Sequence, residues 1–279
     1  MKKYIKLCRI NHYIKNCLIF LPLLFVREMF SPEFINVLYG FLAFSFISSV
    51  VYIINDVKDI EKDRLHPIKK NRPLASNQIK KKEALVIAIF LFIASCFFNY
   101  LASGLSISVF GLLLVYLLIN ILYSFGFKNI VLMDIFCLIL GFLIRVYYGA
   151  SIIGVKVSNW LYLTVMSAAF FLVLGKRRNE IFKSNEKTRK VLEYYSKDFL
   201  DKNMYMCLTL TITFYSLWAI EQNIQYLIMT VPLIIFIFMR YTMIIEGDSH
   251  GDPTDILLRD KVLQGLVIIF GLSMLLLMR

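Results

Sequence analysis

The sequence predicts an all-α membrane protein, and two observations carry that prediction. Hydrophobic residues make up 59% of the 279 residues, a larger share than in ordinary soluble domains. They gather in separate runs of about 20 residues, the length that crosses a bilayer as a helix. We therefore expect one domain over residues 1–279, built as a bundle of transmembrane helices.

Nine apolar runs predict nine transmembrane helices, of which the first is short and flanked by Lys15 and Arg27. The predicted spans are 14–30, 34–54, 84–103, 105–123, 129–149, 158–175, 204–221, 223–241 and 262–278. Most connections between them are tight. Longer polar loops are expected near 55–83, 176–203 and 241–261.

The distribution of basic residues predicts the orientation of the chain. With the N-terminus in the cytoplasm, 27 of the 31 Lys and Arg residues fall in cytoplasmic segments, and Arg27, Lys156 and Arg279 fall on the opposite side. Cytoplasmic loops of membrane proteins carry this excess of Lys and Arg. The pattern explains the net charge of +12 without a nucleic-acid partner, which we do not expect.

The segment 55–63, which reads Asn-Asp-Val-Lys-Asp-Ile-Glu-Lys-Asp, carries the strongest chemical signal. On a helix Asn55, Asp59 and Asp63 fall at i, i+4 and i+8, and Asp56 lies one position off that row. Carboxylates on one face repel each other unless a cation lies among them. Oxygen ligands of this kind suit Mg²⁺, which keeps waters and binds substrate phosphates. The segment therefore predicts a magnesium–diphosphate site at the membrane edge, with these four residues as ligands.

Asp134 and Arg145 lie inside an otherwise apolar run, where ionisable groups are costly and usually face a cavity or a partner. They are eleven residues apart, about three turns, so they point to nearly the same side of a helix. Either they form a buried ion pair that orients helices, or they face an anionic substrate. A transporter with a midplane site here is a further alternative, although interrupted half-helices and paired repeats are not evident. Gly149 on this helix would allow a close backbone approach.

Two further polar groups stand at the ends of apolar runs. Lys176, Arg177 and Arg178 are either topology signals that meet lipid headgroups or ligands for an anion. Lys15 and Asn16 are either interfacial anchors or substrate contacts. The histidines are dispersed, which disfavours a zinc site.

These motifs resemble the UbiA superfamily of intramembrane prenyltransferases. The segment 55–63, closely followed by Asn71-Arg72-Pro73-Leu74 (71–74), is similar to the first aspartate-rich motif of that family. The resemblance covers nearly the whole chain. It implies a nine-helix bundle around a central cavity, with Mg²⁺ holding a diphosphate at the cytoplasmic end.

The second motif resembles one branch of the family. Where prenyltransferases have a paired acidic residue, Asp134 is followed four residues later by Leu138. The segments 123–150, 174–180 and 251–263 instead resemble the polyprenyl-phosphate (decaprenyl-phosphate) phosphoribosyltransferase branch. That branch implies Mg²⁺-dependent transfer of 5-phosphoribose from phosphoribosyl diphosphate (PRPP) to a polyprenyl phosphate such as decaprenyl phosphate, with release of diphosphate.

The resemblance also implies roles for individual residues. Catalytic roles are implied for Asp56, Asp59, Asp63, Lys128, Asp134 and Arg145. Substrate-binding roles are implied for Lys15, Asn16, Asn55, Arg72, Tyr123, Lys176, Arg177 and Arg178. The alternative activity is that of a UbiA-type prenyltransferase, which moves a polyprenyl group from its diphosphate to an aromatic or quinone precursor. Either enzyme is expected in the inner or plasma membrane of a bacterium with its active site on the cytoplasmic side. The sequence leaves open whether it forms a homo-oligomer.

Overall fold

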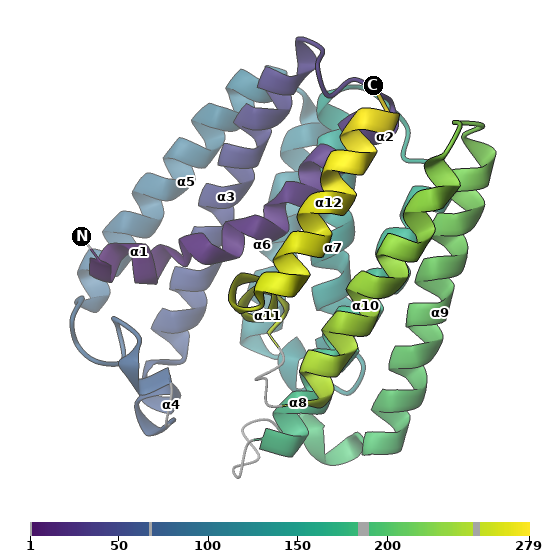
Figure 1. Cartoon of the computed structure of the whole chain (residues 1–279). Helices are drawn as coiled ribbons and strands as arrows, with labels where there is room; N and C mark the ends of the chain where they lie inside the picture. Colours follow the sequence, from purple (N-terminus) through teal and green to yellow (C-terminus); the bar gives the residue numbers. More distant parts are fainter. Residues whose placement is uncertain (1, 67–68, 184–189, 248–251) are drawn as a thin grey trace. The chain divides into compact units, whose positions relative to one another are not determined.

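The computed structural model describes residues 2–66, 69–183, 190–247 and 252–279, and all regular elements in these ranges are helices (Figure 1). The α-helices are α1 (Lys2–Cys8), α2 (Leu21–Phe25), α3 (Glu33–Lys58), α4 (Ile60–Leu65), α5 (Lys81–Ser103), α6 (Ile107–Phe125), α7 (Met133–Ile152), α8 (Asn159–Lys183), α9 (Lys197–Glu221), α10 (Val231–Glu246), α11 (Pro253–Arg259) and α12 (Lys261–Leu277). Short 3₁₀ helices are η1 (Ile10–Phe20), η2 (Lys69–Asn71), η3 (Phe127–Asn129), η4 (Lys190–Tyr194) and η5 (Leu227–Thr230). Parts of the three expected polar loops, 67–68, 184–189 and 248–251, lie outside the described residues, as does Gly251 of the late motif.

The apolar helices make the chain a polytopic membrane protein. Among the described residues, six helices are long and apolar enough to cross a membrane: α3, α5, α6, α7, α8 up to Ile181, and η5 with α10. The bent pair of α11 and α12 gives a seventh if it is counted as one span. The all-α class is confirmed, whereas nine spans and a cytoplasmic N-terminus stay predictions.

Two expected spans, 14–30 and 204–221, are not among the helices that are long and apolar enough to cross a membrane. The first, 14–30, is divided between the 3₁₀ helix η1 and the five-residue α2, and Arg27 adopts a left-handed backbone beyond them. The expected span 204–221 does lie on one helix, α9, but Thr and Tyr side chains make it less apolar than the other long helices.

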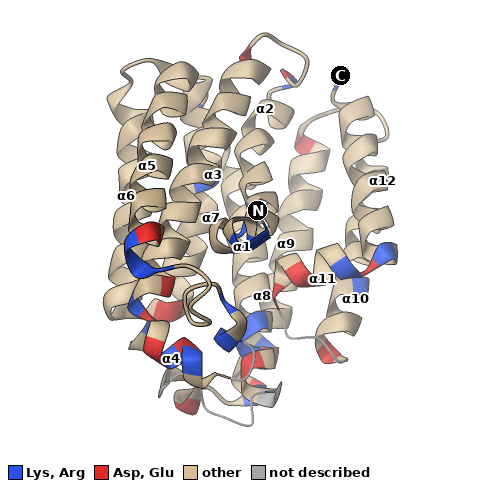
Figure 2. Ribbon diagram, turned by 90° about the vertical axis from the view of Figure 1, so that its left-hand side faces the viewer, with Lys and Arg blue, Asp and Glu red and all other residues tan. Residues whose placement is uncertain are grey.

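The chain divides into two compact units, and the first comprises Met1–Leu21, Ser31–Phe127 and Ile144–Val155. Its centre is α3, which packs along α5 and also contacts α6 and η1. The middle of α3 is apolar and buried, with Phe44 and Ile47 in the core. Many charged residues of this unit lie on α4 and at the start of α5, and the later turns of α5 and all of α6 carry none (Figure 2).

The second unit comprises Pro22–Phe30, Lys128–Leu143 and Lys156–Arg279. Here α8 packs along α9, and α10 contacts both α9 and α12. Trp218 is buried in an apolar cluster and stacks on Phe25, with ring centroids 4.2 Å apart. The helix α7 contributes its first half to this unit and its second half to the first unit, so the single domain predicted over 1–279 stays a prediction.

Gly149 allows α7 to approach η1 at backbone distance, as the sequence predicts. A Cβ atom at this position would lie 2.0 Å from the carbonyl oxygen of Ile19. Real Cβ atoms do not tolerate such a contact with backbone, so only glycine fits here.

We expect Gly149→Ala to lower the free energy of unfolding by about 1–3 kcal/mol, because the new methyl group forces α7 and η1 apart. The matched control is Gly111→Ala in α6, where no atom lies within 4 Å of the added Cβ. That change should be neutral or stabilise the helix, since alanine has the higher helix propensity. Thermal unfolding in detergent measures both variants, and equal unfolding temperatures would contradict the close approach.

Candidate functional site

The acidic segment 55–63 is not one continuous helix. α3 ends at Lys58, Asp59 has φ −96° and ψ 11°, and α4 begins at Ile60. The backbone hydrogen bonds continue through this junction, because Asp59 N donates to the carbonyl of Asn55 (3.0 Å) and Asp63 N to that of Asp59 (2.8 Å). The expected row of Asn55, Asp59 and Asp63 is therefore divided between two helices, with Asp59 at the junction of α3 and α4.

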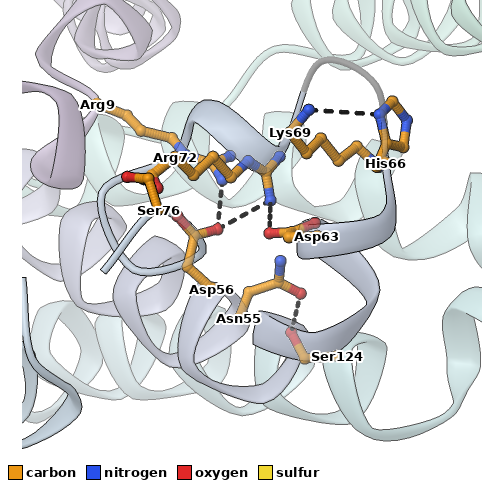
Figure 3. Close-up of polar contacts among 9 residues, drawn as sticks. All are labelled: Arg9, Asn55, Asp56, Asp63, His66, Lys69, Arg72, Ser76 and Ser124. Atoms are coloured by element: carbon orange, nitrogen blue, oxygen red, sulfur yellow. Dashed lines mark hydrogen bonds and ion pairs between the residues drawn. The ribbon is translucent and has the colours of Figure 1, made fainter. Parts of the chain in front are cut away.

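Asp56 and Asp63 are the two carboxylates that face a common point, and arginines hold them there (Figure 3). Nη1 of Arg72 lies 3.1 Å from Oδ1 of Asp56 and 2.7 Å from Oδ2 of Asp63. Arg9, which directly follows α1, donates to the same Oδ1 of Asp56 at 2.5 Å. Both carboxylates are buried, with 2% and 4% of their residue surface exposed, so an unpaired charge here would be costly.

Asn55 is held from the neighbouring helix. The hydroxyl of Ser124, at the end of α6, donates to Oδ1 of Asn55 at 3.1 Å (Figure 3). Lys58 donates to the backbone carbonyl of the same serine at 2.8 Å, and its ammonium lies 3.6 Å from the centroid of the Phe125 ring. These contacts fix the end of α3 to the end of α6 and so fix the direction of the Asn55 amide.

The described residues contain no group of three or more His, Cys, Asp and Glu side chains placed to hold a metal ion. The predicted magnesium ligands Asn55, Asp56, Asp59 and Asp63 therefore stay a prediction. The chemistry of the donors does fit Mg²⁺. Two buried carboxylates already share one cationic atom, the Nη1 of Arg72. Mg²⁺ commonly binds through one or two carboxylates, with waters and substrate phosphates as its other ligands.

Arg145 lies in a buried polar network of the first unit. Its Nε donates to Oδ1 of Asn16 at 2.7 Å, and its Nη2 to the hydroxyl of Tyr116 at 3.2 Å. The guanidinium also lies 4.9 Å from the ring centroid of Phe44. Asn16 is fully buried and donates to Ser45 at 3.0 Å, so it is not an interfacial anchor.

Lys15, Tyr123 and Lys128 are half-buried. The ammonium of Lys15 lies 3.4 Å from Nδ1 of His12.

Asp134 belongs to a closed network of the second unit. Arg177 donates from Nε to its Oδ2, and Tyr195 donates from its hydroxyl to Oδ1, both at 2.7 Å. The Tyr195 hydroxyl in turn accepts from Leu132 N at 2.8 Å. Neither Asp134 nor Arg177 exposes any side chain to solvent, and Arg177 also donates to Glu180 at 2.6 Å. Asp134 therefore forms a buried ion pair with Arg177, whereas the sequence interpretation paired it with Arg145. The catalytic role implied for Asp134 stays a prediction.

Burial and the hydrogen bond to Asp134 raise the pKa of Tyr195 to about 12. The phenol is therefore protonated at neutral pH and can act as the donor in this network.

The basic residues beside Arg177 are also paired, but closer to solvent. Lys176 binds Oδ2 of Asp252 at 2.7 Å, and Arg178 binds Asp201 at 2.5 Å. The side chain of Lys176 is 29% exposed and that of Arg178 is 10% exposed, against none for Arg177. The three consecutive residues predicted to bind an anion thus have different surroundings, and Lys176 is the most accessible.

The decisive comparison is with models of protein families. The model of the UbiA prenyltransferase family matches residues 17–257. The chain belongs to the UbiA prenyltransferase family. The resemblance inferred from 55–63 and 71–74 is confirmed.

Similarity to related proteins covers most of the length of this UbiA family member. It is 30% identical to "Decaprenyl-phosphate phosphoribosyltransferase" of Mycobacterium tuberculosis (strain CDC 1551 / Oshkosh), over 93% of this chain and 89% of the relative. It is also 30% identical to the protein of the same name in Corynebacterium glutamicum, over 95% of this chain and 83% of the relative. The expected resemblance to this branch is likewise confirmed.

A solved structure shares the UbiA fold. A UbiA homolog from Archaeoglobus fulgidus, bound to GPP and Mg²⁺, superposes with a TM-score of 0.71 at 23% identity and covers 98% of this chain and 99% of its own. At this identity the likeness concerns the fold alone.

The sequence analysis did not predict some of the residues that take part in these polar networks. Arg9 was visible only as a basic residue ahead of the first apolar run, and nothing local indicated that it pairs with Asp56. Tyr195 lies in a long polar loop without a motif, and its contact with Asp134 spans 61 positions. Asp252 was part of a motif, but its pairing with Lys176 had no local signal.

We expect Tyr195→Phe to lower the free energy of unfolding by about 1–3 kcal/mol, because it leaves Oδ1 of Asp134 and the N–H of Leu132 without this buried partner. Tyr194→Phe, at a residue that is 74% exposed, is the matched control and should change it by less than about 0.5 kcal/mol. Thermal unfolding of the detergent-purified variants measures both effects. Equal destabilisation by Tyr195→Phe and Tyr194→Phe would show that the hydrogen bonds of Tyr195 do not stabilise the fold.

Proposed function

We propose that this UbiA family member transfers the 5-phosphoribosyl group of PRPP to the phosphate of a polyprenyl phosphate, such as decaprenyl phosphate, and releases diphosphate. The observation that carries the proposal is the 30% identity, over 93% of the chain, to relatives named decaprenyl-phosphate phosphoribosyltransferase. The closed network of Asp134 supports it, because Arg177 and Tyr195 together occupy both oxygens of a carboxylate that a second metal would require.

The reaction breaks the bond between C1 of ribose and the diphosphate oxygen, and forms a bond between C1 and an oxygen of the lipid phosphate. The ribose passes through an oxocarbenium-like state, as at other glycosyl centres. The lipid phosphate is already anionic at neutral pH, so no general base is needed. This requirement agrees with the scattered histidines of the sequence.

Asp56 and Asp59, with Asn55 and Asp63 in support, would hold Mg²⁺. When bound, the ion supplies positive charge that neutralises the departing diphosphate. Arg9 and Arg72 both hold Asp56 in place, and Arg72 also holds Asp63. The guanidinium groups of these arginines suit bidentate binding of phosphate oxygens.

Lys128, Arg145 and Arg178 are the proposed cations for the 5-phosphate and the lipid phosphate. Lys176 is proposed to contact the donor as well. It has the most accessible side chain of the basic run 176–178, and its ion pair with Asp252 suits it to the sugar rather than to a phosphate. Lys15, Asn16 and Tyr123 are proposed to position these groups. Asn16 has the clearest route to that role, because it binds Arg145 directly.

The excess of Lys and Arg in alternate loops supports a cytoplasmic N-terminus and a cytoplasmic active site. PRPP is an ionic, water-soluble donor, and a site on this side of a bacterial inner membrane would meet it there.

The second candidate is prenyl transfer from a polyprenyl diphosphate to an aromatic or quinone precursor. The match to the UbiA prenyltransferase family favours it, because the family is named for this kind of transfer.

We expect the purified protein in detergent to release diphosphate from PRPP only when polyprenyl phosphate and Mg²⁺ are both present. Mass spectrometry of the lipid fraction should find the added phosphoribosyl group. The matched reaction contains a prenyl diphosphate and an aromatic acid. Turnover there, with none from PRPP, would establish the second candidate instead.

Asp56→Asn and Asp59→Asn should each lower kcat/KM by about 10²–10³-fold or more, the loss typical when one stabilising group at a developing charge is removed. Glu61→Gln is the control within the same segment, because its carboxylate is 82% exposed and pairs only at the surface with Arg64. Steady-state kinetics over a Mg²⁺ series measure the effect, and unfolding temperatures check that the variants fold. Wild-type rates in both Asp variants would exclude the metal role.

A further inference from the structure

Two buried hydroxyl groups of the second unit have no hydrogen-bond partner. They are the hydroxyl of Tyr241 and Oγ1 of Thr254, and no other buried side-chain nitrogen or oxygen among the described residues is in this state. Tyr241 is 5% exposed and Thr254 is 2% exposed. Folded proteins pair nearly all such atoms, so two orphans call for an explanation such as a water or a ligand.

The two residues that carry these hydroxyls lie near Asp252. Thr254 N donates to Oδ1 of Asp252 at 3.0 Å, which places the threonine beside that carboxylate. The carboxylate also acts electrostatically on the phenol of Tyr241. The Tyr241 ring contacts Phe171 of α8, with centroids 5.5 Å apart, and Phe171 precedes Lys176 by little more than one turn. Lys176 completes the group by binding Oδ2 of Asp252 at 2.7 Å.

We propose that Lys176, Tyr241, Asp252 and Thr254 form a binding subsite for the hydroxyl groups of a sugar, here called the hydroxyl subsite. This inference rests on the proposed function and assigns the subsite to the pentose of the phosphorylated donor.

Charge balance favours a sugar hydroxyl over a phosphate at this place. Lys176 and Asp252 form a neutral pair, and the carboxylate would repel a second anion at close range. A sugar hydroxyl both donates and accepts a hydrogen bond. It can donate to the carboxylate of Asp252 while it accepts from the hydroxyl of Tyr241 or Thr254.

The subsite combines hidden donors with an accessible edge. The side chains of Lys176 and Asp252 are 29% and 16% exposed, so a ligand can reach the pair from solvent. The hydroxyls of Tyr241 and Thr254 are already removed from water and therefore gain a full hydrogen bond when a polar group arrives.

The test uses the full chain in detergent, with Tyr241→Phe and Thr254→Val as the variants and ribose 5-phosphate as the probe. Inorganic phosphate is the control ligand. Tyr215→Phe is the control variant, because this buried phenol is bonded to Thr230 at 2.5 Å. Thr254→Ser restores a hydroxyl and should restore binding.

Ribose 5-phosphate should bind each hydroxyl-deleted variant about threefold to tenfold more weakly than wild type, as expected when one hydrogen bond is lost. The affinity for inorganic phosphate should not change. Without ligand, Tyr241→Phe should not lower the unfolding temperature, whereas Tyr215→Phe should, because only the latter loses a bond. With PRPP as substrate, KM should rise by the same factor while kcat is retained.

Equal affinity of wild type and Tyr241→Phe for ribose 5-phosphate would overturn the hydroxyl subsite, as would no binding to the wild type. The hydroxyl subsite would also be overturned if the two hydroxyls bind only a structural water. In that case Tyr241→Phe and Thr254→Val would both lower the unfolding temperature without ligand and leave the affinity for ribose 5-phosphate unchanged. Absence of PRPP turnover by the wild type is a different result. It overturns the proposed function, and the ribose 5-phosphate affinities still decide the subsite.

Discussion

Pairing of buried carboxylates with arginines is the interaction on which both polar clusters depend. A charge that is buried among apolar helices without a partner costs several kcal/mol of desolvation free energy. Asp56 offsets this cost by pairing with Arg9 and Arg72. These ion pairs connect α3 to the residue after α1 and to the loop after η2. Asp134 offsets the same cost by pairing with Arg177, and this pair connects α7 to α8. In each unit the ion pairs that make burial tolerable also fix where the helix ends lie.

The two clusters differ in how exposed the side chains of their arginines are. Arg72 is 25% exposed while it holds two buried carboxylates, so its contacts can be exchanged for those of a cation or a phosphate. Arg177 and Asp134 expose nothing, and Tyr195 occupies the remaining carboxylate oxygen. A metal could reach Asp134 only by breaking a buried pair, which is strongly unfavourable. Of these two clusters, only that of Asp56 and Asp63 has a partner open to exchange.

The sequence predicted what depends on local pattern and missed what depends on distant partners. Hydropathy alone gave the helical membrane class, and the spacing within 55–63 located the acidic cluster. Arg9 and Asp56 are 47 positions apart, Arg177 and Asp134 are 43 apart, and Lys176 and Asp252 are 76 apart. No local rule relates such residues, because their meeting is decided by how the helices pack. The helix break at Asp59 was also not predicted, because the residue pattern of segment 55–63 is compatible with one continuous helix.

Unpaired hydroxyls bear on which donor a UbiA scaffold accepts. An apolar prenyl chain placed against Tyr241 and Thr254 would leave both hydroxyls buried and unbonded, so it would gain nothing for the desolvation already incurred. A sugar that bonds to them recovers that cost. Sites built around hydrogen bonds discriminate strongly against ligands that lack the matching group, by about 10⁴–10⁵ in the best cases, because the protein's own polar atoms are then left unsatisfied. Under the proposed function, a common helical scaffold would thus choose between a sugar and an isoprenoid through a few buried oxygen atoms. The diphosphate site proposed for segment 55–63 would be the same in both cases.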